Sequence, residues 1–217
     1  MSAGTTRTLA VVSSGLRQPS TSRLLADRLS AAVVRALRTQ GVEPVVEVVE
    51  LREHAHDLTN MLMTGFATES LQAALDTVTG ADGVIAVTPI FSGSYTGLFK
   101  TFFDVMDDGA LAGTPVLAAA TAGTARHSLA IDHAVRPLLS YLRAVVVPTG
   151  VFAATDDFGS RDGTRTTASR DGEVALGSRI ERGAAELAEL VARREARRAR
   201  DPFTVTTPFE DLLRGGA

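Results

Sequence analysis

The residues that could do chemistry gather in three short polar stretches, each following a short apolar run. The first stretch, residues 13–23, carries five hydroxyl side chains and two arginines and precedes a segment of helical periodicity. Free N–H groups at a helix start attract anions, and hydroxyl and guanidinium groups donate hydrogen bonds to phosphate. This composition predicts a phosphate-binding loop. The simpler alternative is a polar turn in which Ser20 caps the following helix.

The stretch matches neither of the two common glycine-rich phosphate motifs. It lacks G-x-G-x-x-G, which is typical of dinucleotide folds, and G-x-x-x-x-G-K-[ST], which is typical of nucleotide triphosphatases. Any phosphate bound here must therefore be held by hydroxyls, arginine and the helix start.

The second stretch, residues 88–97, combines flat apolar side chains with turn-forming residues. Pro89, Ile90 and Phe91 are followed by Gly93 and Gly97. Exposed backbone N–H groups beside an apolar surface suit a planar heterocycle with polar edges. The alternative is a plain turn with Phe91 packed in the core.

The third stretch, residues 121–127, has small residues followed by His127 at the expected start of a helix. A single histidine most often has a structural role, but this one follows a predicted strand. His54, His56 and Asp57 are the other candidates for a special site, as metal ligands. Two histidines two positions apart in a loop are a weak metal pattern, so we predict no metal site.

Short apolar runs alternate along the chain with longer segments of helical periodicity, which is typical of a parallel α/β sheet. The strands are predicted at residues 7–13, 43–51, 83–88, 115–121 and 145–152, and the helices at 20–40, 67–79, 96–107 and 128–143. This pattern predicts a flavodoxin-like, doubly wound sheet of five parallel strands in the order 2-1-3-4-5, with helices on both faces. Ligands bind at the carboxyl ends of such strands, so the three polar stretches should meet at one edge.

The C-terminal part differs in composition. Residues 155–172 are polar and predict a loop, and residues 178–200 return to helical periodicity and end in a run of arginines. Residues 201–217 are expected to form a tail. We therefore predict a domain at residues 1–155 and a C-terminal helical extension at 156–217 that is not an independent domain.

The overall composition excludes several classes of protein. The chain has 217 residues, 45% of them hydrophobic and 22% charged, with a net charge of −3, as in ordinary globular proteins. No apolar run reaches the roughly 18 residues of a membrane span, and no signal peptide is recognised, so we expect a cytoplasmic protein without membrane contact. The chain has no cysteine, which excludes disulfides, thiolate metal sites and a cysteine nucleophile. The slightly acidic balance argues against a nucleic-acid partner.

Three motifs resemble the NAD(P)H-dependent FMN reductase family. They are S-G-L-R-Q-P-S-T-S at 14–22, T-P-I-F-S-G-S-Y-T-G-L-F-K-T-F-F-D at 88–104 and A-T-A-G-T-A-R-H-S-L-A-I-D-H-A at 120–134. The resemblance covers about residues 7–155 and is nearest to reductases that supply reduced FMN to a partner flavin-dependent monooxygenase. It implies a flavodoxin-like flavin-binding domain, FMN as the flavin, NADPH or NADH as the hydride donor, and a homodimer or homotetramer.

The resemblance also implies which residues bind FMN. The phosphate would be bound by Ser14, Arg17, Ser20, Thr21 and Ser22. The isoalloxazine ring would contact Pro89, Ile90, Phe91, Ser92, Gly93 and Ser94. The third side of the flavin site would be closed by Thr121, Gly123, Thr124 and His127. One departure is that this chain has Ser14-Gly15 where many members have Gly-Ser. No catalytic side chain is expected, because hydride passes directly from the nicotinamide to the flavin.

Two other functions fit the same pattern. One is a reductase of quinones, azo dyes or chromate that keeps FMN bound, and the other is a non-enzymatic flavodoxin-like flavin-binding module. The helix expected near residues 97–106 has apolar residues around much of its circumference, which predicts that a second subunit covers part of it.

Overall fold

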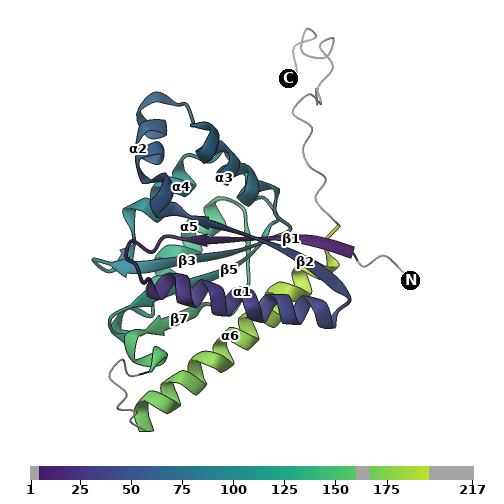
Figure 1. The fold of residues 1–217 in the computed structure, drawn as a ribbon, viewed down its shortest axis with the longest axis vertical. Coiled ribbons are helices and arrows are strands. Elements are labelled where there is room, and N and C mark those ends of the chain that lie inside the picture. The colour runs from purple at the N-terminus through teal and green to yellow at the C-terminus, as the bar shows by residue number, and fades with distance from the viewer. Residues whose placement is uncertain (1–4, 160–166, 196–217) are drawn as a thin grey trace.

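The computed structural model describes residues 5–159 and 167–195 (Figure 1). A mainly parallel sheet lies between two layers of helices, with the strand order β2-β1-β3-β5-β6. The main strands are β1 (Thr5–Ser13), β2 (Val42–Glu50), β3 (Gly83–Phe91) and β5 (Pro115–Ala122). The predicted flavodoxin-like fold class is confirmed.

The two central strands are buried on both faces because their sequences are apolar on both faces. Residues Leu9 to Val12 of β1 are at most 1% exposed, and β1 pairs in parallel with β2 on one side and β3 on the other. β3 in turn pairs in parallel with β5. The ends of β1, β3 and β5 therefore lie next to one another, which brings the three polar stretches to a common edge.

The last part of the sheet differs from the prediction of one continuous strand at residues 145–152. Two short strands, β6 (Val145–Val146) and β7 (Val151–Ala154), both pair with β5. Pro148 and Gly150 lie between them, and proline cannot donate a ladder hydrogen bond. A further short strand, β4 (Ser94–Tyr95), pairs antiparallel with β3.

Each face of the sheet has its own helices and hydrophobic cluster. α1 (Thr21–Thr39) and α6 (Thr167–Arg193) pack side by side on one face. The other face carries α2 (Ala55–Thr64), α3 (Glu69–Gly80), α4 (Gly97–Asp104) and α5 (Arg136–Tyr141).

α6 begins earlier than the sequence suggests, so the prediction of a loop through residue 172 is wrong. A 3-10 turn, η4 (Thr155–Phe158), follows β7. The buried face of α6 repeats every three to four residues, with Leu176, Ile180, Ala184, Leu187 and Val191 in the core. The end of the predicted helix and the predicted tail, residues 196–217, lie outside the described residues.

The far end of α6 is fastened to the first strand. The buried Arg7 guanidinium donates from Nε to the Val191 carbonyl at 3.3 Å and from Nη2 to the Arg194 carbonyl at 2.5 Å. These carbonyls belong to the last turn, where a cation is favourable. α6 also lies close to the sheet at Gly83, where a Cβ would meet Val191 Cγ2 at 2.5 Å.

Two helical segments were not predicted correctly. Residues 51–64, expected to contain a loop, form a 3-10 turn η1 (Leu51–His54) followed by α2, so His54, His56 and Asp57 are helical. The single helix expected at 128–143 is instead a 3-10 turn η2 (Ala125–His127), a π-helical turn η3 (Ile131–Val135) and the short α5. Within residues 5–159 and 167–195, no group of three or more side chains could hold a metal ion, and no helix is long and apolar enough to cross a membrane.

The apolar surface of α4 is covered by this chain itself. Phe99, Phe102 and Phe103 are at most 1% exposed, with edge-to-face ring contacts at centroid distances of 4.8 and 5.5 Å. Leu98 and Met106 pack against the same cluster. The three buried phenylalanines therefore need no second subunit, and the number of subunits stays a prediction.

Candidate functional site

A cleft of about 510 Å³ opens at the carboxyl edge of the sheet, where the three predicted loops meet. Its lining consists of Gly15, Leu16, Arg17, Pro19, Ser20, Thr21, Ser22, Pro89, Ile90, Phe91, Thr121, Ala122, Gly123 and Thr155. We call it the three-loop cleft. It brings together most of the predicted residues, but Ser14, Ser92, Gly93, Ser94, Thr124 and His127 are not part of its lining.

The phosphate end of the three-loop cleft is the start of α1. The Ser20 Oγ accepts the Arg23 N–H at 3.2 Å, and the Ser20 carbonyl accepts the Leu24 N–H at 3.1 Å, so Ser20 is the N-cap. The N–H groups of Thr21 and Ser22 make no hydrogen bond to any described residue. The first turn contains no acidic residue. This helix start is therefore suited to an anion.

A buried hydroxyl pair joins the first loop to the third. Ser22 Oγ and Thr121 Oγ1 are 2.8 Å apart, and both residues are at most 2% exposed. Only one of the two hydroxyl protons is used between them, so the other remains available to a ligand in the cleft.

Gly15 lies against the capping serine. A Cβ at this position would fall 2.0 Å from Ser20 Oγ and 3.3 Å from Ser22 Cβ. The preceding residue, Ser14, is buried and turned toward β3: its Oγ donates to the Val87 carbonyl at 3.4 Å and accepts from Thr96 Oγ1 at 3.3 Å. The Ser14-Gly15 order therefore leaves space for the cap, and the Ser14 hydroxyl stabilises the neighbouring strand.

Arg17 lines the cleft and makes no ion pair with any described residue. Arg23, by contrast, is bound to Asp27 at 2.8 Å and to Glu50. The hydrogen bond that Arg23 donates to Asp27, together with the one to Glu50, raises the pKa of Arg23 above its ordinary value despite some desolvation. Arg23 thus fastens α1 to the end of β2 and leaves Arg17 for a ligand.

The second loop is a tight β-hairpin. Ser92 and Gly93 have φ angles of 50° and 84°, which is the sign pattern of a two-residue hairpin turn between Phe91 and Ser94. Phe91 is 51% exposed, so the alternative that packs it in the core is wrong. The hairpin holds Phe91 at the wall of the cleft, while Ser92, Gly93 and Ser94 form the tip next to it.

The third loop contributes its first residues only. Thr121 and Gly123 line the cleft, whereas Thr124, which precedes η2, and His127, its last residue, are exposed. Thr155, which follows β7, was not predicted as a lining residue. It could have been found only by recognising that β7 ends beside β5, because its own sequence carries no motif.

The model of the family described as NADPH-dependent FMN reductase matches residues 7–159. The chain belongs to this family. It is therefore an NAD(P)H-dependent FMN oxidoreductase, with FMN as its flavin and NADPH or NADH as hydride donor. The match ends before α6 begins.

Two similar relatives are both FMN reductases by name and differ in the donor. The chain is 41% identical to an FMN reductase (NADPH) of Pseudomonas aeruginosa over 68% of this chain and 76% of that one. It is 38% identical to the NADH-dependent FMN reductase SfnE of Pseudomonas putida over 66% and 74% of the two chains. Sequence similarity alone therefore does not assign the donor.

Solved structures show the same architecture. An oxidoreductase from Corynebacterium diphtheriae superposes with a TM-score of 0.80 at 47% identity, covering 89% of this chain and all of that one. An NADH:FMN oxidoreductase in its apo form superposes with a TM-score of 0.70 at 27% identity, covering 90% and 96%. The donor set of the cleft fits FMN: hydroxyls and an arginine surround a helix start, and an exposed aromatic side chain lies at the wall.

Proposed function

We propose that the FMN reductase uses the three-loop cleft to bind FMN and releases the reduced flavin to a partner flavin-dependent monooxygenase. One observation carries this proposal. The start of α1 at residues 20–22, which has a serine N-cap and no acidic residue in its first turn, lies in the same cleft as the exposed Phe91. A phosphate and a flat apolar ring joined by a polar chain match these two ends.

The phosphate would be bound by Arg17, by the hydroxyls of Ser20 and Thr21, and by the free N–H groups at the start of α1. Ser22 pairs with Thr121 between the first and third loops, and the hydroxyl proton that this pair leaves free can bind the phosphate. Each such contact to a charged phosphate contributes about 1.5–3 kcal/mol.

The ring would lie against Pro89, Ile90 and Phe91. Bound FMN supplies the chemistry, because its ring accepts hydride from the nicotinamide. The protein's part is to hold the two rings in contact and to place backbone N–H groups of the hairpin at the polar edge, where negative charge develops. The hairpin turn fixes that backbone, so no acidic or basic side chain is needed.

Steady-state oxidation of NADH and NADPH with FMN, FAD, riboflavin and a quinone as acceptors tests the proposal. We expect FMN to be the best acceptor. A higher kcat/KM for the quinone, with FMN retained in stoichiometric amounts through purification, would instead favour the quinone-type reductase. Absence of nucleotide oxidation with every acceptor would favour the non-enzymatic module.

Release of reduced FMN can be measured directly. Under argon, with excess FMN and NADH, reduced flavin should pass an ultrafiltration membrane while the protein is retained. Flavin that stays with the protein would contradict a role in supplying a monooxygenase.

We also propose a homodimer or homotetramer located in the cytoplasm, where nicotinamide nucleotides are available. Support for assembly comes from three exposed apolar side chains. Leu62 and Met63 of α2 are 55% and 82% exposed, and Phe66, two residues after its end, is 80% exposed. Light scattering at micromolar concentration should give a mass above that of one chain.

A further inference from the structure

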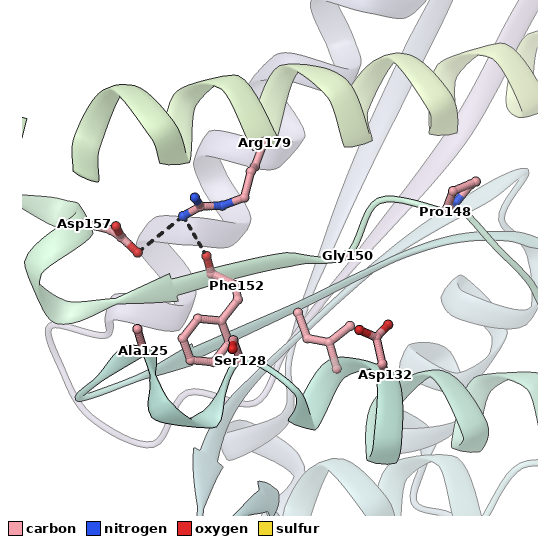
Figure 2. A pocket seen from close by; sticks show the side chains of 9 residues that line it. Ala125, Ser128, Asp132, Pro148, Gly150, Phe152, Asp157 and Arg179 are labelled. Carbon is pink, nitrogen blue, oxygen red and sulfur yellow. Dashed lines mark hydrogen bonds and ion pairs between the residues drawn. The ribbon is translucent and has the colours of Figure 1, made fainter. Parts of the chain in front are cut away.

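A second pocket, of about 390 Å³, lies between η2, η3, the segment after β6 and α6 (Figure 2). Ala125 and Ser128 line one side, Arg179 of α6 lines the opposite side, and Phe152 lies between them. We call it the α6 pocket. Arg179 lies beyond residue 159, where the family match ends, so the match does not cover this wall of the pocket.

The α6 pocket adjoins the three-loop cleft through two chain segments. Gly123 lines the cleft and Ala125 lines the pocket; likewise Thr155 lines the cleft and Asp157 lines the pocket. Residues two positions apart are separated by at most about 7 Å. A ligand with two halves can therefore place one half in the cleft and the other in the pocket.

The polar groups of the α6 pocket are held in place by hydrogen bonds. Arg179 Nη2 donates to the Phe152 carbonyl at 3.2 Å and lies 3.4 Å from Asp157 Oδ2. Asp157 Oδ2 also accepts the Ala154 N–H at 2.9 Å. The Nε of Arg179 is buried and has no hydrogen-bond partner among the described residues. Arg179 therefore fixes this wall of the pocket through its bonds to Phe152 and Asp157.

The balance of charge in the α6 pocket is negative. Its lining carries the carboxylates of Asp132 and Asp157 against the single cation Arg179, which is already paired with Asp157. Asp132 is paired at the pocket's outer side with Arg136 Nε at 3.2 Å, and its side chain is 60% exposed. A free carboxylate oxygen accepts hydrogen bonds from a diol, whereas a dianionic phosphate beside two carboxylates is repelled.

We propose that the α6 pocket binds the adenosine half of the hydride donor and favours NADH over NADPH. This inference rests on the proposed function, because it names the donor of the same reaction. Asp132 accepts a hydrogen bond from the adenosine ribose hydroxyl that carries a phosphate in NADPH, which is the role acidic residues have in other NAD sites. The apolar side chains of Phe152 and Ile131, which line the pocket, contact the base.

The test compares kcat/KM for NADH and NADPH, with FMN as acceptor, in the wild type, Asp132→Ala and Asp132→Arg. The wild type should prefer NADH. A hydrogen bond to a charged group is worth about tenfold in affinity or more, so Asp132→Ala should lower the NADH/NADPH ratio about tenfold, and Asp132→Arg should lower it further. Asp108→Ala, which removes an exposed carboxylate outside both cavities, is the control and should leave the ratio unchanged.

A second readout separates this inference from the proposed function. ADP-ribose is titrated by calorimetry without flavin; Asp132→Ala should weaken its binding about tenfold, and Ser22→Ala, a change in the three-loop cleft, should not. If FMN is reduced but the wild type prefers NADPH, or the ratio is the same in Asp132→Ala, the pocket assignment is wrong and the proposed function stands. If no FMN is reduced with either donor, the proposed function fails, whatever the titration gives.

Discussion

The two cavities of the molecule, the three-loop cleft and the α6 pocket, are built in different ways. The three-loop cleft is formed by short loops, and the helix start within it is fixed by a contact between near neighbours, the Arg23 N–H that Ser20 Oγ accepts. The α6 pocket is formed where distant segments meet, and its shape depends on contacts across more than twenty residues, such as Arg179 with Phe152. Changes in the first cavity should therefore alter flavin binding, and changes in the second should alter the use of the donor.

The largest effect is expected for Ser20→Ala combined with Ser22→Ala. Loss of two charge-assisted contacts of about 1.5 kcal/mol or more each should weaken FMN about a hundredfold, measured by fluorescence titration. Riboflavin, which lacks the phosphate, should be weakened far less. Thr68→Ala removes the equivalent cap of α3, a hydrogen bond to the Leu71 N–H at 3.2 Å, and should cost about 1 kcal/mol of stability without changing FMN affinity. An equal loss for both flavins would contradict the phosphate assignment.

The next effect is expected for Gly15→Ala. The added methyl group would displace the Ser20 hydroxyl, since the two would be only 2.0 Å apart, so α1 loses its cap and the cleft loses a donor. We expect FMN affinity to fall about tenfold and the free energy of unfolding to fall by about 1 kcal/mol. Gly177→Ala is the matched control, because a Cβ there meets no atom within 4 Å and should stabilise α6 slightly. Unchanged FMN binding in Gly15→Ala would show that Ser20 is not a phosphate ligand.

The difference between local contacts and contacts between distant segments also explains how much of the structure the sequence could predict. β1 and α1 were predicted within about two residues, because an apolar run, hydroxyl-rich turn and amphipathic stripe are all local signals. α6 was placed about ten residues too late, because the polar composition of its first turns resembles a loop and the apolar residues of its buried face lie at 176–191. The α6 pocket has no sequence motif, since its residues meet only after the chain has folded.

Ser14 shows the same limit inside the predicted site. A serine before a glycine-containing, hydroxyl-rich loop is a reasonable phosphate ligand by sequence. Its direction is decided by the carbonyl of Val87 and the hydroxyl of Thr96, two contacts with residues more than seventy positions away. Residue type was therefore predictable, but the side to which the residue points was not.

A moderate effect is expected for Glu186→Ala in α6. The two carboxylate oxygens of Glu186 accept the N–H and the hydroxyl of Thr149, each at 2.7 Å, and so hold the segment that carries Pro148 and Gly150 at the α6 pocket. Its loss should raise the KM for NADH severalfold and lower stability by about 1.5–3 kcal/mol, with FMN affinity unchanged.

Two variants of the same helix sharpen this measurement. Glu186→Gln keeps one acceptor for the Thr149 N–H and should recover part of the loss. Glu189→Ala removes only an exposed pair with Arg193 and should change little. If Glu186→Ala weakened FMN as much as NADH, the two cavities would not be independent.

The smallest effect is expected at a contact that belongs to neither cavity. Arg38 at the end of α1 donates to Glu43 of β2 at 2.7 Å, and this hydrogen bond lowers the pKa of the exposed Glu43 below its ordinary value of 4.5. A lowered pKa in the folded state means that the contact stabilises the fold above about pH 4.5 and that this contribution is lost as the pH falls through the folded-state value. Glu43→Gln should therefore lower the urea midpoint slightly at pH 7 in low salt, and the difference from the wild type should shrink below pH 4.5 and in high salt. FMN affinity and the NADH/NADPH ratio should both stay at wild-type values, because a change in either would mean that the cavities respond to surface contacts far from their linings.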